Sequence, residues 1–298
     1  MLTHVTDEEI DALAQEVRNW GRWGQDDQVG TVNLITDSSR REGAATITTG
    51  RVVSLARPLD LGPDHGGVRA PVHTTWKTFG TPAETAADFV GLAFHGPTVT
   101  HLDSLNHVHI DDRMYNGHDA RVFNPIGGYP VLSVEHLASR LCGRAVLLDL
   151  PVAGVEPDVV GVRPEFGVEH LEMCAAALRI EVSEGDMVLV RFGDSPYNHV
   201  DPTPGLAPEA VRWLHRIGAA SLGSDGPTDA FPAREGRWKV PIHQLAIFAM
   251  GMPLFDNCRL DELSRVAAEH ERYTFFLAAP ALPIRGATGS PFNPLAVF

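Results

Sequence analysis

Two kinds of hydrophobic pattern alternate along this chain, and the alternation limits the folds open to it. Short apolar runs typical of strands occur at Val52–Leu59, Phe89–Phe94, Val146–Leu150, Met187–Phe192 and Tyr273–Ala279. Segments with helical periodicity lie before and between them, at Thr6–Asn19, Val168–Leu178, Pro208–Arg216 and Arg259–Glu271. Because strands and helices alternate without internal repeats or low-complexity linkers, the sequence predicts an α/β fold, a mixed β-sheet with packed helices.

Composition limits the class of protein. The 298 residues are 44% hydrophobic and 21% charged, which is ordinary for a soluble globular protein, and we expect a single domain spanning residues 1–298. No apolar run approaches the length of a membrane span, and the N-terminus is acidic and helix-patterned, unlike a secretory signal. We therefore expect a cytoplasmic protein without a membrane partner.

Charge and cysteine content exclude further classes. A net charge of −14 would repel a phosphate backbone, and no cluster of Lys and Arg offers a local exception, so nucleic acid is not an expected partner. Cys142, Cys174 and Cys258 are widely separated and lie outside any CxxC spacing. This pattern argues against a disulfide framework and against a zinc finger.

A histidine-rich stretch is the strongest indication of chemistry. Five of the chain's 14 histidines lie between residues 95 and 118. Even spacing separates His101, Asp103 and His107, so in an extended segment all three side chains would face the same way. Imidazole and carboxylate together suit Zn²⁺, Mn²⁺ or Fe²⁺, and a cluster with open coordination positions is typical of catalytic sites. A hydrogen-bonded buried pair of His101 and Asp103 is the alternative.

The same stretch carries a family resemblance. The segment THLDSLNH, residues 100–107, resembles the THxDxPxH signature of the cyclase family of metal-dependent hydrolases, which includes kynurenine formamidases, isatin hydrolases and trans-dienelactone hydrolases. The similarity extends over most of the chain, through RWGQDDQVGTVNLI, MVLVRFG, SLGSDGPTDA, PIHQLAIFAMGMPLFDN and TGSPFNPLAV. It implies a swivelling β/β/α fold, a small-molecule substrate, one or two Zn²⁺ or Mn²⁺ ions per chain, and a homodimer or homotetramer.

The resemblance also implies roles for individual residues. His101, Asp103 and His243 match metal ligands of the family. His107 matches its catalytic histidine, which acts as general base and acid. An imidazole suits that role because it titrates near neutral pH.

Two positions depart from the family pattern. Asp256 stands where the family commonly carries a glutamate ligand, and because Asp is one methylene shorter, capping of a helix near Leu260 is the alternative role. A further family ligand, four residues before the THxD segment, is replaced by Pro97, which has no ligand atom. His95 would take its place if the chain bends at Gly96–Pro97, and would lie too far away without that bend.

Several nearby polar residues have less specific expectations. His109 is expected to support the metal ligands or to be structural. Asp225, Thr228 and Arg191 lie in segments that approach the pocket in relatives, but turn chemistry explains the SDGP sequence equally well.

The C-terminal segment GATGSPFNP, residues 286–294, lacks the lysine and the spacing of a phosphate-binding loop. We expect it to fold over the site, where Phe292 would line the pocket of an aromatic or cyclic substrate. No GxSxG motif and no cysteine-centred nucleophile motif is present, which argues against the usual serine and cysteine hydrolases.

Together these features predict a metal-dependent hydrolase that opens an amide, lactam or lactone bond of a small cyclic or aromatic substrate. The ion would polarise the carbonyl and activate water, and His107 would move the proton. Two alternatives remain open from the sequence. One is a metal-dependent cyclase or dehydratase of polyketide-type biosynthesis, and the other is a non-catalytic, metal-stabilised binding protein.

Overall fold

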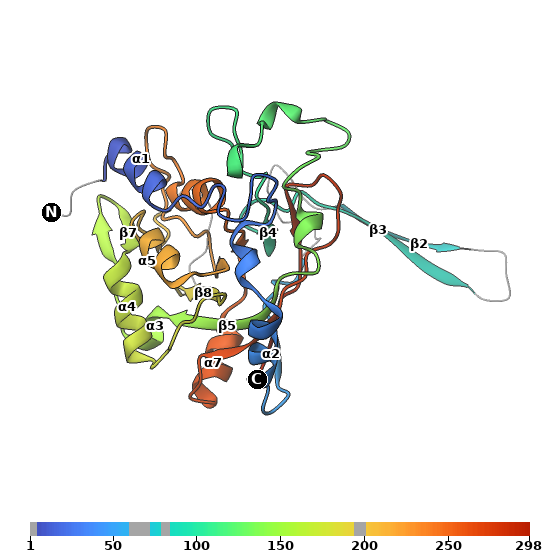
Figure 1. Cartoon of the computed structure of the whole chain (residues 1–298). Helices are drawn as coiled ribbons and strands as arrows, with labels where there is room; N and C mark the ends of the chain where they lie inside the picture. The colour runs from blue at the N-terminus through green and yellow to red at the C-terminus, as the bar shows by residue number, and fades with distance from the viewer. Residues whose placement is uncertain (1–4, 60–71, 79–83, 194–200) are drawn as a thin grey trace.

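A mixed nine-stranded sheet forms the centre of the molecule (Figure 1). The computed structural model describes residues 5–59, 72–78, 84–193 and 201–298. Residues 61–71, whose glycine and proline content predicts a loop, lie outside them. In spatial order the strands are β1 (Val52–Ser54), β14 (Leu295–Val297), β12 (Thr274–Ala278), β5 (Cys142–Asp149), β8 (Met187–Arg191), β10 (Ser221–Ser224), β11 (Leu254–Asp256), β4 (His101–Asp103) and β13 (Gly289–Pro291).

The middle of this sheet is parallel and its margins are antiparallel. Strands β5, β8, β10 and β11 run in the same direction, while β12, β14 and β1 on one side and β4 and β13 on the other are antiparallel to their neighbours. The centre of β5, Ala145–Leu148, and most of β8, Met187–Val190, are continuous apolar runs because both faces of these strands are buried there. The prediction of a mixed α/β sheet is confirmed.

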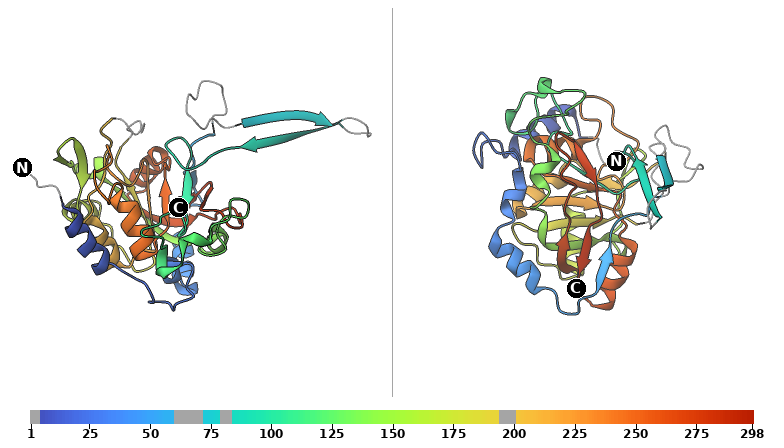
Figure 2. Two further views of the ribbon diagram at one scale, coloured as in Figure 1. Left: turned by 90° about the horizontal axis from the view of Figure 1, so that it is seen from above. Right: turned by 90° about the vertical axis from the view of Figure 1, so that its right-hand side faces the viewer.

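Two smaller sheets accompany the main one. Strands β2 (Val72–Thr78) and β3 (Thr85–Gly91) form a hairpin that projects from the body of the molecule (Figures 1 and 2). Strands β6 (Asp158–Val160), β7 (Arg163–Phe166) and β9 (Gly205–Leu206) form a three-stranded sheet.

The helices pack around the main sheet. They are α1 (Asp7–Glu16), α2 (Asp37–Ala45), α3 (Leu150–Ala153), α4 (Val168–Ala177), α5 (Ala210–Ile217), α6 (Pro241–His243), which continues into a π-helix at Gln244–Met250, and α7 (Asp261–Glu269). Helix α1 begins as expected, with a capping box between Thr6 and Glu9, and buries Ile10 and Leu13. None of the helices in the described residues is long and apolar enough to cross a bilayer.

Two predicted strands differ in extent from the observed ones. Of Val52–Leu59 only β1 is a strand, because the chain leaves the sheet after Leu55, whose amide donates to Pro294 O (2.9 Å). The apolar run Phe89–Phe94 is divided, its first residues closing β3 and residues 92–94 lying outside regular secondary structure before the bend at His95. The strands and helices predicted further along the chain correspond to β5, β8, β12, α4, α5 and α7, with ends that differ by a few residues.

The sheet edge formed by β11, β4 and β13 positions the histidine-rich stretch. In the antiparallel register of β11 and β4, Asp256 lies opposite His101 and Leu254 lies opposite Asp103. On the other side of β4, Gly289 lies opposite Asp103. Segments more than 150 residues apart in sequence therefore meet at this edge.

Candidate metal centre

His101 and Asp103 point to the same side of β4, as their spacing predicts. Both side chains are almost fully buried, with exposed fractions of 3% and 1%. His101 Nδ1 donates a hydrogen bond to Val99 O (2.8 Å), which leaves Nε2 unprotonated in the neutral ring. That Nε2 lies 3.5 Å from Asp103 Oδ1.

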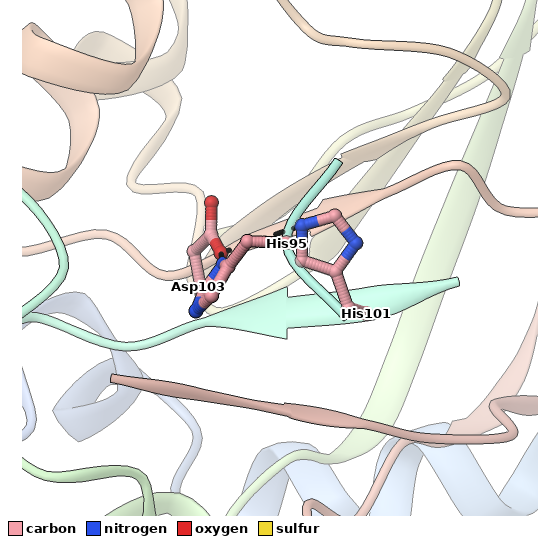
Figure 3. A group of neighbouring side chains, drawn as sticks. All are labelled: His95, His101 and Asp103. Carbon is pink, nitrogen blue, oxygen red and sulfur yellow. Dashed lines mark ion pairs between the residues drawn. The ribbon is translucent and has the colours of Figure 1, made fainter. Parts of the chain in front are cut away.

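The chain bends after His95 and brings that histidine to Asp103. Gly96 adopts φ +135°, a backbone conformation that L side chains rarely adopt, and a turn follows at Pro97. His95 Nδ1 lies 2.8 Å from Asp103 Oδ1, and Figure 3 shows the two side chains gathered with His101. The other ring nitrogen, Nε2, lies 3.0 Å from Thr288 Oγ1. The bend anticipated at Gly96–Pro97 is present.

His107 reaches the same cluster by a route different from the one expected. Strand β4 ends at Asp103, so His107 is not on the same extended segment, and the predicted parity argument is wrong for this residue. A turn in which the His107 amide donates to Ser104 O (3.0 Å) carries the ring back. His107 Nε2 lies 3.7 Å from Asp103 Oδ2, and the ring stacks on that of His95 with centroids 4.1 Å apart.

The second half of the chain contributes His243 and Asp256. His243 is the last residue of α6, and its Nε2 lies 3.5 Å from Asp103 Oδ2 and 3.1 Å from Asp256 Oδ2. Asp256 is the last residue of β11 and is buried. The helix-capping alternative for Asp256 is wrong, because α7 starts after Leu260 and has no side-chain cap.

These residues fit a divalent cation. Possible ligand atoms lie within 4.8 Å of one another in two groups, His95, His101 and Asp103, and Asp103, His243 and Asp256. Asp103 belongs to both. The two carboxylate oxygens of Asp103 and the Nδ1 atom of His95 are buried and make no hydrogen bond among the described residues, although His95 Nδ1 lies 2.8 Å from Asp103 Oδ1. Buried polar atoms that converge without hydrogen-bond geometry are those that a cation would satisfy.

Charge and burial set the protonation of the cluster. Burial would raise the pKa of Asp103, but electrostatic interaction with His107 and His101, together with His243 and His95, outweighs it and holds the Asp103 pKa well below its usual range. Burial lowers the pKa of His107 to about 4, against the opposing effect of Asp103, so this ring is neutral at pH 7. Burial opposes the charge on His243, yet Asp256, Asp103 and Asp229 raise its pKa well above the usual value.

Asp229 supports His243 and is a residue that sequence reasoning missed. Its carboxylate is 1% exposed and accepts hydrogen bonds from His243 Nδ1 (2.6 Å), His243 N (3.1 Å) and Ile242 N (2.7 Å). This carboxylate directs His243 Nε2 toward Asp103. The adjacent Thr228 donates from Oγ1 to Asp256 Oδ1 (3.1 Å), which leaves Asp256 Oδ2 facing His243. The motif SDGPTDA marked the region but not these two roles.

The remaining predicted residues lie around the cluster. His109 Nε2 donates to Asn106 O (2.9 Å) and the ring packs on Tyr129, a structural position. Asp225 accepts hydrogen bonds from the amides of Phe192 and Gly193, and burial raises its pKa to about 6.

Arg191 is paired with Asp149 (3.0 Å) at the ends of β8 and β5. The C-terminal segment pairs with β4 through β13, and Phe292 is mostly buried against Phe255. Contact of Phe292 with a substrate stays a prediction.

Comparison with known proteins places the chain in a family. The model of the Cyclase family matches residues 3–229. The crystal structure of a novel cyclase superposes with a TM-score of 0.83 at 29% sequence identity, and the match covers 95% of this chain and 100% of that one. The chain therefore belongs to the Cyclase family, and the cyclase-like fold expected from the sequence is confirmed.

More distant structures share the fold. Isatin hydrolase A from Ralstonia solanacearum matches with a TM-score of 0.58 at 22% identity, over 83% of this chain and 92% of its own. A predicted metal-dependent hydrolase from Bacillus stearothermophilus matches with a TM-score of 0.52 at 18% identity, over 84% of this chain and 98% of its own. No curated protein matches the sequence significantly.

Proposed function

We propose that this chain is a metal-dependent hydrolase that opens an amide, lactam or lactone bond of a small cyclic or aromatic substrate. One observation carries the proposal. The buried Asp103 carboxylate has no hydrogen bond within the described residues, yet nitrogens of His95, His101, His107 and His243 surround it at 2.8–3.7 Å. The names of the isatin hydrolases and metal-dependent hydrolases that share this fold are consistent with it.

His95, His101, Asp103, His243 and Asp256 would hold the ion. Imidazole and carboxylate ligands suit Zn²⁺ or Mn²⁺, and the position of Asp103 in both ligand groups accommodates one ion or two. When bound, such an ion supplies a Lewis acid for the carbonyl and lowers the pKa of nearby water.

His107 is suited to move the proton. It belongs to neither ligand group, its side chain is 29% exposed, and its low pKa keeps the ring neutral and able to accept a proton at pH 7. His107 takes a proton from the attacking water and returns it to the leaving nitrogen or oxygen. Asp103, whose Oδ2 lies 3.7 Å from His107 Nε2, stabilises the charge that the ring gains.

Product chemistry tests the reaction class. The protein loaded with Zn²⁺ or Mn²⁺ is incubated in ¹⁸O-labelled water with panels of aryl formamides, lactams and lactones. We expect a ring-opened or deformylated carboxylic acid that carries one labelled oxygen. A dehydrated or cyclised product without the label would support the cyclase or dehydratase alternative and contradict the hydrolase. Metal binding without turnover of any panel would favour the binding protein.

Substitution of two histidines separates their roles. His107→Ala should lower kcat by about 10²–10⁴-fold with metal content unchanged, because only proton transfer is lost. His101→Ala should lose the metal, as measured by elemental analysis. The matched control is His109→Ala, which removes a ring that contacts Asn106 and Tyr129 and should change neither quantity. Full activity in His107→Ala would contradict its assignment as the base.

A further inference from the structure

Asn257 connects the end of β11 to the turn that carries His95. It directly follows Asp256, the last residue of β11, and is buried, at 2% exposure. Its side-chain nitrogen Nδ2 donates to Gly96 O (2.6 Å) and to Val99 O (3.2 Å), which lie at the two ends of that turn. Because both partners are carbonyl oxygens, an amide NH₂ group satisfies them and a carboxylate would not.

The contact with Gly96 fixes the backbone where the local sequence leaves it free. Gly96 adopts φ +135°, and a glycine can adopt many other conformations as readily. Pro97 has no ligand atom, so it is the bend that brings His95 Nδ1 to 2.8 Å from Asp103 Oδ1. A donor that holds Gly96 O therefore holds His95 at the cluster.

The contact with Val99 acts on His101. Val99 O accepts a hydrogen bond from His101 Nδ1 (2.8 Å) as well as from Asn257, so two donors fix this carbonyl group. The bond from Nδ1 orients the imidazole with Nε2 toward Asp103, 3.5 Å from Oδ1. A shift of the Val99 carbonyl would turn that ring away from the cluster.

The main chain of Asn257 is itself held by hydrogen bonds. Its carbonyl oxygen accepts from Thr100 Oγ1 (2.6 Å), and its amide donates to Gly226 O (3.1 Å). The residue adopts φ +56°, in the left-handed region where Asn is enriched among residues other than glycine. The side-chain amide therefore extends from a fixed point at the end of β11.

We propose that Asn257 is a positioning residue of the metal centre, whose side-chain amide holds His95 and His101 in the arrangement that receives a divalent cation. A ligand that must be ordered when the ion binds lowers the affinity, and a ligand that is already ordered does not. The inference rests on the proposed function, in which both histidines hold the ion.

Titration with Co²⁺ tests the inference, because the visible absorption of the bound ion depends on the geometry of its ligands. The full chain is stripped with EDTA and titrated with Co²⁺ alone. Asn257→Gly accepts the φ of +56° without strain and removes only the side chain. We expect the Kd for Co²⁺ to rise by about 10–100-fold and the spectrum of the bound ion to change. Asn257→Asp keeps the volume but loses the donor, and should have the same effect.

Asn116 provides the control for a structural effect. It is also buried, at 8% exposure, adopts φ +60°, and donates from Nδ2 to Gly24 O (2.9 Å) and Gln25 O (3.0 Å), away from the ligand groups. Asn116→Gly should lower the Tm of the metal-free protein as Asn257→Gly does, yet leave the Kd and the spectrum of bound Co²⁺ unchanged. Circular dichroism checks that each variant is folded.

A double-mutant cycle tests the route through His95. If Asn257 acts by holding that ring, Asn257→Gly should weaken Co²⁺ binding less in a His95→Ala background than in the wild type, by about threefold or more. The small effect of Asn116→Gly should be the same in both backgrounds. Full additivity of Asn257→Gly and His95→Ala would overturn the proposal.

The titration separates failure of this inference from failure of the proposed function. A wild-type protein that binds no Co²⁺ would overturn both. Wild-type binding, with an equal Kd and an identical spectrum in Asn257→Gly, would overturn the role of Asn257 and leave the metal centre standing. A rise in Kd as large in Asn116→Gly as in Asn257→Gly would show a general loss of stability and would also overturn that role.

Discussion

Asp103 is the residue on which the candidate site depends. Its oxygens face different partners, Oδ1 toward His95 and His101 and Oδ2 toward His107 and His243. A carboxylate buried to 1% exposure without hydrogen bonds among the described residues would destabilise the fold if nothing compensated its charge. The surrounding imidazoles compensate it partly, and a divalent cation would compensate it further.

The supporting carboxylate of Asp229 leads to a prediction about metal affinity. Asp229→Asn keeps the shape of the side chain but removes the charge of the carboxylate that accepts a hydrogen bond from His243 Nδ1. The imidazole of His243 then loses its orientation and part of its basicity. We expect metal affinity to fall by about 10–100-fold, measured by competition with a chromophoric chelator.

Asp225→Asn is the matched control for Asp229→Asn. Asp225 is a buried aspartate four positions earlier that accepts hydrogen bonds from the amides of Phe192 and Gly193 and is in neither ligand group. Its substitution should leave the affinity nearly unchanged. Equal affinities in the two variants would show that Asp229 does not support the metal ligand.

At the scale of elements, the sequence predicted those whose ends are marked locally. The capping box at Thr6 defined the start of α1, and the unbroken apolar runs of β5 and β8 defined central strands. Of the hairpin of β2 and β3 only Phe89–Gly91 was predicted, because most of its described side chains are exposed and give no long apolar run.

The sequence predicted only part of the candidate site, because the site also depends on contacts between distant segments. His101 and Asp103 followed from their spacing on one strand, and His107, His243 and Asp256 were identified by family resemblance. Their convergence depends on the pairing of β4 with β11 and β13, which is a long-range property of the sheet. Asp229 was missed for the same reason, since its partner His243 lies 14 residues away on another element.

Thr288, which precedes β13, gives a prediction at this scale. Its hydroxyl lies 3.0 Å from His95 Nε2, so it holds the ring with Nδ1 toward Asp103. Thr288→Val keeps the shape but removes the hydroxyl, and should weaken metal binding by about tenfold or more. Thr288→Ser keeps the hydroxyl and should retain affinity, measured by calorimetric titration. If the Val and Ser variants bind equally, the hydroxyl does not position His95.

For the whole molecule, the proposed ion would join distant parts of the chain. Its ligands come from the turn at His95, from β4, from α6 and from β11, so the unfolded chain does not hold them together. A ligand that binds only the native state stabilises it by mass action, by about 2.7 kcal/mol at a concentration 100 times its Kd. For a chain of 298 residues this corresponds to an increase in Tm of about 4 °C.

Thermal unfolding with and without metal tests that coupling. Protein stripped with EDTA should unfold at a lower temperature, and Zn²⁺ or Mn²⁺ should restore the Tm of the loaded protein. His101→Ala removes a ligand that lies in β4, so the same additions should leave its Tm unchanged. If the ion raises the Tm of His101→Ala as much as that of the wild type, the cluster around Asp103 is not the source of the stabilisation. The ion would then bind elsewhere on this acidic protein.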